Sequence, residues 1–169
     1  MIHQTLPSPL LKKYHLDLPM SQYNLFKKDP KPNPKIDYFD MKKKWDQALR
    51  VFAFTGQEID SIYGLVGLIG NVGNVRVERG VDEYSNCTIV RDESWEYVLE
   101  LCGADGEMLE KFFMNKVTVI GEEVNFTVMR WEDCVGKVGV FARAVYYELF
   151  EWLVMRTDVG GGVRGVFIR

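Results

Sequence analysis

Apolar side chains recur three and four positions apart over several stretches of this chain, and that spacing predicts amphipathic helices. The predicted helices cover residues 38–53, the stretch after Thr55, residues 92–102, residues 105–113 and residues 131–156. Thr55 and Glu58 stand at the spacing of a capping box, in which each side chain accepts the backbone amide of the other residue, so a helix should begin between them. Asp92 and Gly103 are the matching start and stop signals of the third helix.

The helix predicted over residues 131–156 is apolar around most of its circumference. Val140, Phe150 and Val154 widen its main apolar stripe almost to the opposite face. Helices of this kind usually lie at the centre of a core, so we expect this one to be buried on most sides. The stripe itself consists of Val138, Phe141, Ala142, Val145, Leu149, Trp152 and Leu153.

Alternation of apolar and polar residues predicts β-strands elsewhere. Residues 116–120 and 124–128 alternate on either side of a turn at Gly121–Glu122, which predicts a β-hairpin. Further strands are expected at residues 74–78 and 163–169. The predicted fold class is therefore mainly α with short β-hairpins (α+β).

The first 37 residues lack a regular pattern and contain all six prolines of the chain. Proline removes a backbone donor and disfavours helix at the residue before it. We therefore expect a surface segment with one short helix near Ser8–His15. The predicted organisation is an irregular segment over residues 1–37, followed by a helical subdomain over residues 38–169.

Four glycines, Gly64, Gly67, Gly70 and Gly73, stand three apart inside the second predicted helix. Their spacing matches neither G-x-G-x-x-G nor G-x-x-x-x-G-K-[ST], and no strand precedes them, so they do not predict a phosphate-binding loop. Glycines three apart share one helix face and allow another stretch of backbone to come close. Each costs the helix about 1 kcal/mol relative to alanine.

The composition of the chain mainly excludes classes of function. The chain has 169 residues, of which 47% are hydrophobic and 27% charged, with a net charge of −3, as in an ordinary globular domain. The first 50 residues carry a net charge of +5, which is too weak to indicate a nucleic-acid partner. No signal peptide is recognisable, and charged residues interrupt every apolar stretch before it reaches the length of a membrane span. Neither a nucleic-acid nor a membrane partner is predicted.

Residues with catalytic potential are few. Cys87, Cys102 and Cys134 have neither metal-ligand spacing nor the pattern of a disulfide framework, which favours a reduced, cytosolic chain. The chain has only two histidines, and acidic pairs such as Glu122–Glu123 are more typical of solvated charge than of catalysis. No catalytic, cofactor-binding or metal-binding residue is therefore predicted.

Several segments, taken in order, resemble the upper 50-kDa region of a myosin motor domain. The most similar is Gly139–Val154 (GVFARAVYYELFEWLV), which resembles the family's A-L-A-K-A-(I/V)-Y-x-R-(L/M)-F-x-W helix. Val72–Val75 (VGNV) stands where myosins carry L-G-N and a hydrophobic residue. The resemblance implies a partial myosin-motor subdomain related to the P-loop NTPases. Further similar segments are Leu11–Leu25, Leu49–Thr55, Ile62–Ile69 and Tyr97–Gly103.

The P-loop, switch I and switch II, with which myosins bind and hydrolyse ATP, are not found in this sequence. By resemblance, the first two would precede residue 1, and switch II would follow a strand at Gly165–Arg169. The resemblance therefore implies a fragment of an ATP-driven motor that is inactive by itself. MgATP would be a cofactor of the complete motor and not of this chain.

The resemblance also implies an actin-facing loop over residues 116–126, often called the cardiomyopathy loop. Lys116 would supply a basic contact to the acidic actin surface. Glu123 would supply a permanent negative charge at a regulatory position that is acidic or phosphorylatable in the family. The implied partners are the actin filament and the remainder of a myosin heavy chain, in the cytoplasm and at the cytoskeleton. The core of the loop is Lys116, Val117, Thr118, Val119, Ile120, Gly121, Glu122, Glu123 and Val124.

An alternative from another functional class stays open, namely a non-catalytic, standalone helical interaction domain derived from a myosin head. The coding sequence on both sides discriminates the two, because only a split motor would carry a Walker loop upstream and D-x-x-G-F-E downstream. We also expect marginal stability. The strand at Val163–Ile168 and the glycine face of residues 64–73 would each lack part of a packing partner.

Overall fold

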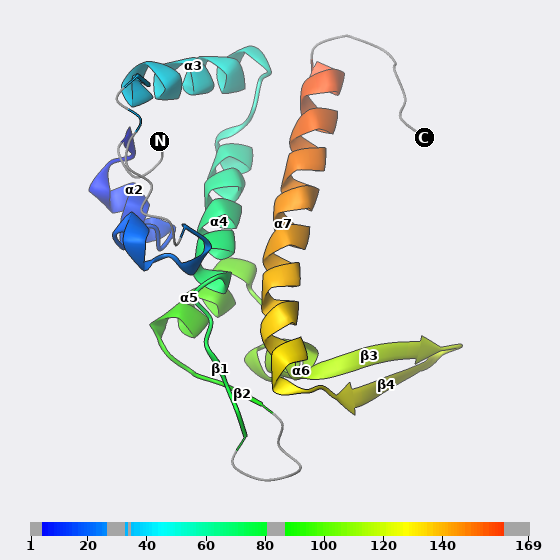
Figure 1. Cartoon of the computed structure of the whole chain (residues 1–169). Coiled ribbons are helices and arrows are strands. Elements are labelled where there is room, and N and C mark those ends of the chain that lie inside the picture. The colour runs from blue at the N-terminus through cyan, green and yellow to red at the C-terminus, as the bar shows by residue number, and fades with distance from the viewer. Residues whose placement is uncertain (1–4, 27–32, 34, 81–86, 161–169) are drawn as a thin grey trace.

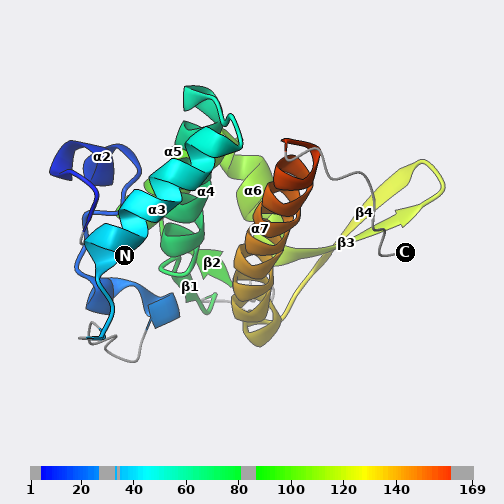
Figure 2. The ribbon, with the colours of Figure 1, turned by 90° about the horizontal axis from the view of Figure 1, so that it is seen from above.

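The computed structural model describes residues 5–26, 33, 35–80 and 87–160. Two long helices, α4 (Gly56–Val72) and α7 (Trp131–Gly160), lie side by side, and α3 (Tyr38–Val51) lies across the N-terminal end of α4 (Figures 1 and 2). Two β-hairpins lie at the other end. The remaining elements are α2 (Ser8–Lys13), the short 3-10 helices η1 (Met20–Gln22) and η2 (Asn24–Phe26), β1 (Val77–Glu78), β2 (Thr88–Ile89), α5 (Glu93–Cys102), α6 (Gly106–Met114), β3 (Asn115–Ile120) and β4 (Glu123–Val128).

The predicted start of α4 and the predicted start and end of α5 are confirmed by their caps, whereas α7 continues to Gly160, beyond its predicted end at residue 156. The Thr55 amide donates to Glu58 Oε2 at 2.7 Å and the Glu58 amide to Thr55 Oγ1 at 3.2 Å, which is the predicted capping box of α4. The Asp92 carboxylate accepts the Trp95 amide at 3.2 Å and starts α5. Gly103 ends that helix with a left-handed backbone (φ 62°), a conformation that glycine adopts without penalty.

The main core lies where α4, α5, α6 and α7 meet. Trp95 and Val98 of α5 and Phe113 of α6 are almost completely buried there, and the Trp95 and Phe113 rings meet edge to face. Burying such side chains contributes about 1.5–3 kcal/mol each relative to leaving them in water. The buried members of this cluster are Leu68, Val72, Val75, Ile89, Trp95, Val98, Leu109, Phe113, Val138 and Ala142.

The short helix expected near Ser8–His15 is confirmed as α2, but part of the expected surface segment is buried. Tyr14, Leu16 and Tyr23 are buried and pack with Tyr63 of α4, because the glycine face of α4 leaves room for them. A Cβ atom on Gly67 would lie 2.1 Å from the Tyr14 carbonyl oxygen, and one on Gly73 would lie 2.4 Å from Leu25 Cγ. The predicted close approach of backbone is thus confirmed at Gly67. The N-terminal residues cover the face at Gly67, Gly70 and Gly73, while no described atom lies within 4 Å of a Cβ on Gly64.

Only one side of α7 is packed, so the prediction of a helix buried on most sides is wrong for the described chain. Val138, Ala142 and Leu149 face the core. The stripe opposite them meets no described element, because α3 and α4 cover a single side of the helix (Figures 1 and 2). Its exposed apolar residues are Val140, Tyr147, Val154 and Met155. Tyr146 and Phe150, at its edge, are also exposed but line a cavity shared with α3 and α4.

The strands form two separate antiparallel hairpins, which confirms the mainly α class with short β-hairpins. In the first, Val77 pairs with Ile89 and Glu78 with Thr88, so the strand expected at residues 74–78 is only two residues long. The strand expected at residues 163–169 lies outside the described residues. Within the described chain, no helix combines the length and the apolar character that crossing a membrane requires.

Candidate functional site

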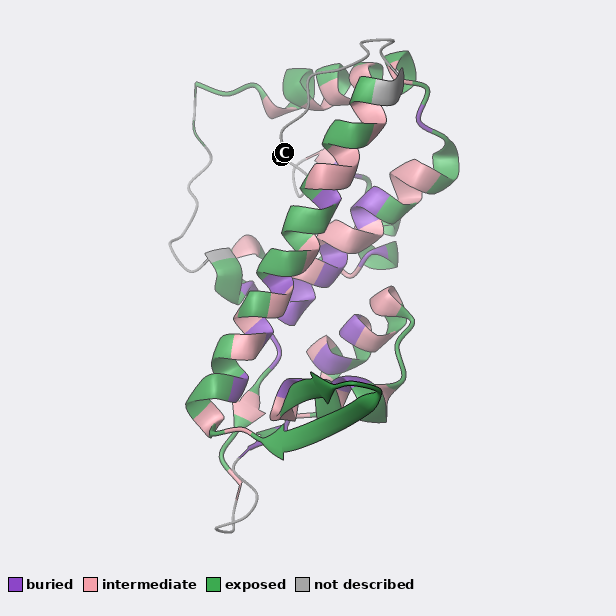
Figure 3. Cartoon of the chain, turned by 90° about the vertical axis from the view of Figure 1, so that its right-hand side faces the viewer, coloured by how far each residue is buried: buried purple, intermediate pink, exposed green. Residues whose placement is uncertain are grey.

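The β3–β4 hairpin is the most exposed element of the fold and extends away from the helices (Figures 1 and 3). Its register pairs Lys116 with Thr127, Val117 with Phe126 and Ile120 with Glu123. Gly121 takes a left-handed backbone (φ 64°) at the turn. The hairpin and its Gly121–Glu122 turn are therefore confirmed, and every residue predicted for the actin-facing loop lies on it and is exposed.

The register divides the hairpin into two faces of different chemistry, because side chains alternate along each strand and paired residues share a face. One face is mostly polar and is made of Lys116, Thr118, Ile120, Glu123, Asn125 and Thr127. The other face is apolar beyond Asn115 and is made of Val117, Val119, Val124, Phe126 and Val128. Val119 is 64% exposed and Val124 is 52% exposed, so this apolar face is open to a partner.

Lys116 and Glu123, the two charged positions singled out from the sequence, lie on the same face at opposite ends of the hairpin. Lys116 stands near the root and Glu123 next to the turn. The Lys116–Thr127 pair and the Ile120–Glu123 pair lie four strand positions apart, which is roughly 13 Å along the strands. No ion pair joins them within the described chain. Each charge is consequently available to a partner.

The root of the hairpin is fixed to α6 and α7. Lys137 of α7 donates from Nζ to the Asn115 carbonyl oxygen at 2.6 Å and also to the Phe112 carbonyl oxygen. Burial lowers the pKa of Lys137, and its ammonium lies 4.0 Å from the centre of the Phe112 ring. The Lys111 ammonium covers the ring of Phe126 at 4.0 Å. These contacts hold the first residues of the hairpin while its outer part stays free.

The structure joins Cys87 and Cys134 in a disulfide, so the expectation of reduced cysteines is wrong for this pair. Their separation of 47 residues follows no local disulfide or metal pattern, and only the tertiary fold brings β2 to the start of α7. Cys102 is a free cysteine. The only sequence signal was the presence of more than one cysteine in a chain predicted to fold as a single subdomain.

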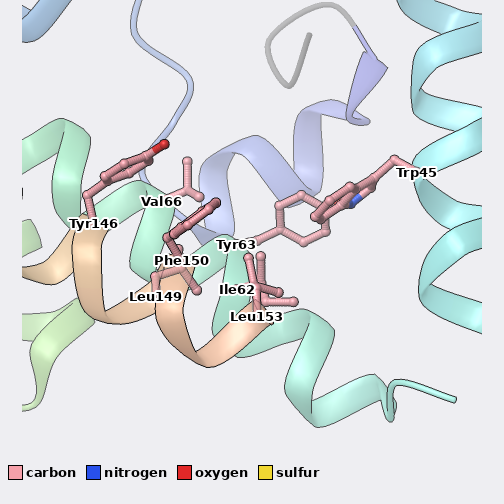
Figure 4. Close-up of a pocket in the computed structure, with 8 residues that line it drawn as sticks. All are labelled: Trp45, Ile62, Tyr63, Val66, Tyr146, Leu149, Phe150 and Leu153. Carbon is pink, nitrogen blue, oxygen red and sulfur yellow. The ribbon is translucent and has the colours of Figure 1, made fainter. Parts of the chain in front are cut away.

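An apolar cavity of about 230 Å³ lies between α3, α4 and α7 (Figure 4). Its walls contain no acid, amine or thiol, and the buried hydroxyl of Tyr63 has no hydrogen-bond partner among the described residues. This composition suits packing, and the phenols of Tyr63 and Tyr146 are the ionisable groups among the lining residues. The lining residues are Trp45, Ile62, Tyr63, Val66, Tyr146, Leu149, Phe150 and Leu153.

The charged residues of the second cavity, beside α2, are already paired. Lys13 and the Tyr14 hydroxyl both donate to the Asp60 carboxylate. Burial and the nearby Asp60 carboxylate raise the pKa of Tyr14, while Lys13 lowers the pKa of Asp60. Within the described residues, no group of three or more His, Cys, Asp or Glu side chains could hold a metal ion. The hairpin is therefore the strongest candidate site.

Comparison with known proteins identifies the family to which this fold belongs. A model of the myosin head (motor domain) matches residues 1–159. The chain belongs to the myosin head family. This match confirms the resemblance drawn from the ordered segments around Val72–Val75 and Gly139–Val154.

Relatives of this myosin-head chain come from animals and plants. Unconventional myosin-Ic of Mus musculus is 30% identical over 127 residues, which are 75% of this chain and 11% of that protein. Unconventional myosin-XV of Homo sapiens is 30% identical over 112 residues, covering 66% of this chain and 3% of that protein. Myosin-17 of Arabidopsis thaliana is 28% identical over 112 residues, covering 64% of this chain and 7% of that protein. The chain thus spans about a tenth or less of the length of these relatives.

Proposed function

We propose that this chain is part of an actin-based, ATP-driven myosin motor and that its β3–β4 hairpin is a contact surface for the actin filament. The family match supports the motor assignment. The observation that carries the actin contact is the hairpin itself, which presents open apolar positions such as Val119 and Val124 beyond the body of the fold. A monomeric soluble protein rarely leaves an apolar surface of this kind open without a binding role.

Lys116 and Glu123 would then act separately within this contact. Lys116, at the root, attracts an acidic filament surface, and such an exposed attraction weakens as salt is added. Glu123 lies beside Glu122 at the turn and places negative charge at the end of the hairpin. We assign the regulatory position to Glu123. Its permanent negative charge would repel an acidic partner and so limit how closely the turn approaches that partner.

The ATPase chemistry would belong to the complete motor, which is related to the P-loop NTPases. Phosphoryl transfer relies on a phosphate-binding loop and on residues that hold Mg²⁺ and position water, and this sequence has none of those motifs. The exposed stripe of α7, which includes Val140, Phe150 and Val154, would pack on the remainder of the heavy chain. The assignment also places the chain in the cytoplasm, at the cytoskeleton.

Co-sedimentation with actin filaments tests the hairpin contact. The chain is compared with Lys116→Glu and with Lys43→Glu, a matched control in which the same charge reversal is made at an exposed position of α3. We expect Lys116→Glu to pellet several-fold less than the other two at low salt, and the difference to shrink at high salt. Equal pelleting of all three proteins, or pelleting of none, would remove support for the hairpin as the contact.

A standalone interaction domain remains the second candidate, because the open stripe of α7 would serve a separate partner as well as the rest of a heavy chain. Sequencing the transcript on both sides of the chain separates the two. A Walker loop upstream together with D-x-x-G-F-E downstream establishes the motor, while a native start and stop establish the standalone domain.

A further inference from the structure

The outer edge of β3, on the side away from β4, is exposed and lacks the features that usually protect an edge strand. The register is unbroken from the Asn115–Val128 pair to the Ile120–Glu123 pair, so no bulge turns this edge away. The strand contains no proline, and Lys116 near the root is its one charged residue. Among the described residues, no other helix or strand forms a backbone hydrogen bond with it. The hairpin instead extends away from the helices (Figures 1 and 3).

Two hydrogen bonds at the root show which backbone groups of β3 face outward. The Met114 carbonyl oxygen accepts the Met129 amide across the hairpin at 3.1 Å. The next carbonyl oxygen, that of Asn115, instead accepts Lys137 Nζ of α7 at 2.6 Å. Because backbone groups alternate in direction along a strand, the amide and carbonyl of Val119, four positions further on, also face outward. The backbone at Val119 is therefore available to pair with another strand.

We propose that the outer edge of β3 pairs with the same edge of a second copy of this chain. The two β3 strands run antiparallel, and a two-fold axis passes between Val119 of one copy and Val119 of the other. The strands then form one sheet in the order β4–β3–β3–β4. A two-stranded hairpin is only marginally stable in water, whereas a sheet of three or more strands with an apolar face is stable. The pairing thus stabilises the projecting part of the hairpin.

Charge complementarity favours a second copy as the partner. With Val119 on the axis, Lys116, three positions before it, faces Glu122, three positions after it, in the other copy. The symmetry repeats this contact, and opposite charges that face each other stabilise paired strands. Within the described chain neither residue has an ion-pair partner. β4 carries Glu123 and no basic residue, so its own outer edge offers no such match.

The size and the faces of the joined sheet follow from the same register. Alternation is preserved across the axis, so Val119 and Val124 of both copies share one face and stay open. The inference goes beyond the proposed actin contact and does not depend on it. An edge this short buries less than the roughly 1,000 Å² of a stable interface, so we expect a weak dimer that depends on concentration.

Exchanging the two charges tests the pairing. Sedimentation equilibrium at low salt and rising concentration compares the parent, Lys116→Glu, Glu122→Lys and the variant with both changes, after circular dichroism has verified that each is folded. We expect either single change to weaken the dimer several-fold and the double change to restore it, because each charge again faces its opposite. A mixture of the two single variants should also dimerise, since each supplies the charges that the other lacks.

Three results would overturn the proposal. The first is a parent that stays monomeric at every concentration, which would leave the edge to a strand of another protein. The second is assembly that grows beyond the dimer, because a two-fold pairing is closed. The third is dimerisation that ignores the charges, with the single variants as strong as the parent or the double variant as weak as they are.

Cross-linking identifies the edge that pairs. In a background of Cys102→Ser, which removes the free cysteine, Val119→Cys and Val124→Cys each place one thiol on the same face but on different strands. A short bis-maleimide should join two copies of Val119→Cys several-fold faster than two copies of Val124→Cys, because β3 lies at the axis and β4 at the outside of the sheet. Equal rates, or a faster reaction of Val124→Cys, would contradict pairing through β3. Neither experiment involves actin, so a failure here is distinct from a failure of the actin contact.

Discussion

Arg156, near the end of α7, forms an ion pair with Glu58 in the first turn of α4, with 2.7 Å between Nε and Oε1. The same guanidinium donates to the carbonyl oxygens of Phe52 and Ala53 at 3.3 and 2.9 Å, and it lies 4.9 Å from the centre of the Phe54 ring. One side chain therefore fastens the loop between α3 and α4 to the far end of α7. The Glu58 carboxylate links this contact to the α4 capping box.

The charge of Glu58 makes this fastening sensitive to acid. The hydrogen bond from Arg156, followed by the one from the Thr55 amide, lowers the pKa of Glu58 from 4.5 to about 2. A carboxylate with a lowered folded-state pKa stabilises the fold above its unfolded-state value, and that stabilisation is lost as the pH falls through the folded-state value. The contribution should therefore be complete above pH 4.5 and should disappear toward pH 2.

Thermal melting of the chain and of Glu58→Gln over this range measures the effect. We expect Glu58→Gln to melt a few degrees lower at pH 7 and the difference to close as the pH approaches 2. Glu122→Gln, in the exposed hairpin turn, is the matched control and should follow the parent throughout. A constant gap between Glu58→Gln and the parent at every pH would contradict a role for the carboxylate charge.

The two apolar positions Leu49 and Phe39 of α3 should differ sharply when truncated. Leu49 is 4% exposed and packs with Phe54, Ile62 and Leu149, whereas Phe39 is 71% exposed. Leu49→Ala removes buried methyl groups and leaves a cavity, which costs about 2–5 kcal/mol. Phe39→Ala should stay within about 0.5 kcal/mol of the parent. Urea unfolding gives both values, and equal losses would mean that α3 packs by another face.

Local signals predicted much of this fold. The Thr55–Glu58 capping box and the Asp92 cap depend on residues three apart, so they are visible in the sequence and were recovered with the helix starts they imply. The β3–β4 hairpin is likewise local, because its turn at Gly121 fixes the pairing of the strands on either side. The residues of the candidate site could for that reason be placed on one element before the fold was known.

Long-range packing accounts for what the sequence did not predict. The burial of Tyr14 and Tyr23 depends on α4, which begins more than 30 residues further along the chain. The prolines around these residues instead indicated an irregular surface segment. The Cys87–Cys134 pair similarly depends on how β2 meets α7. Periodicity predicts the wide apolar surface of α7, but it carries no information on which partner covers Phe150 or Val154. Only the neighbouring elements decide that.

The isolated chain should neither bind nor hydrolyse MgATP. The sequence contains no G-x-x-x-x-G-K-[ST] loop and no D-x-x-G-F-E segment, so it lacks the groups that cradle the phosphates and position the attacking water. Phosphate release by the purified chain should equal the buffer blank with or without actin filaments, and calorimetry with MgATP should show no binding heat. Turnover that co-purifies with the folded chain over two columns would contradict the prediction.

Replacing Gly67 or Gly64 of α4 with alanine should change the free energy of unfolding in opposite directions. A methyl group on Gly67 would meet the Tyr14 carbonyl oxygen at 2.1 Å, whereas one on Gly64 would have no described atom within 4 Å. Because the Tyr14 carbonyl is backbone, it cannot swing aside as a flexible side chain would. Gly67→Ala should therefore destabilise the chain by about 1–3 kcal/mol through overpacking. It should also detach Tyr14 and Tyr23 from α4.

Gly64→Ala should instead stabilise the chain by about 0.5–1 kcal/mol, because alanine loses less backbone entropy in a helix. Urea unfolding measures both effects, and limited proteolysis reports whether residues 5–26 stay protected. Protection should fall in Gly67→Ala and remain unchanged in Gly64→Ala. If the two variants were equally stable and equally protected, the N-terminal residues would not be seated on the glycine face, and the burial of Tyr14 would need another explanation.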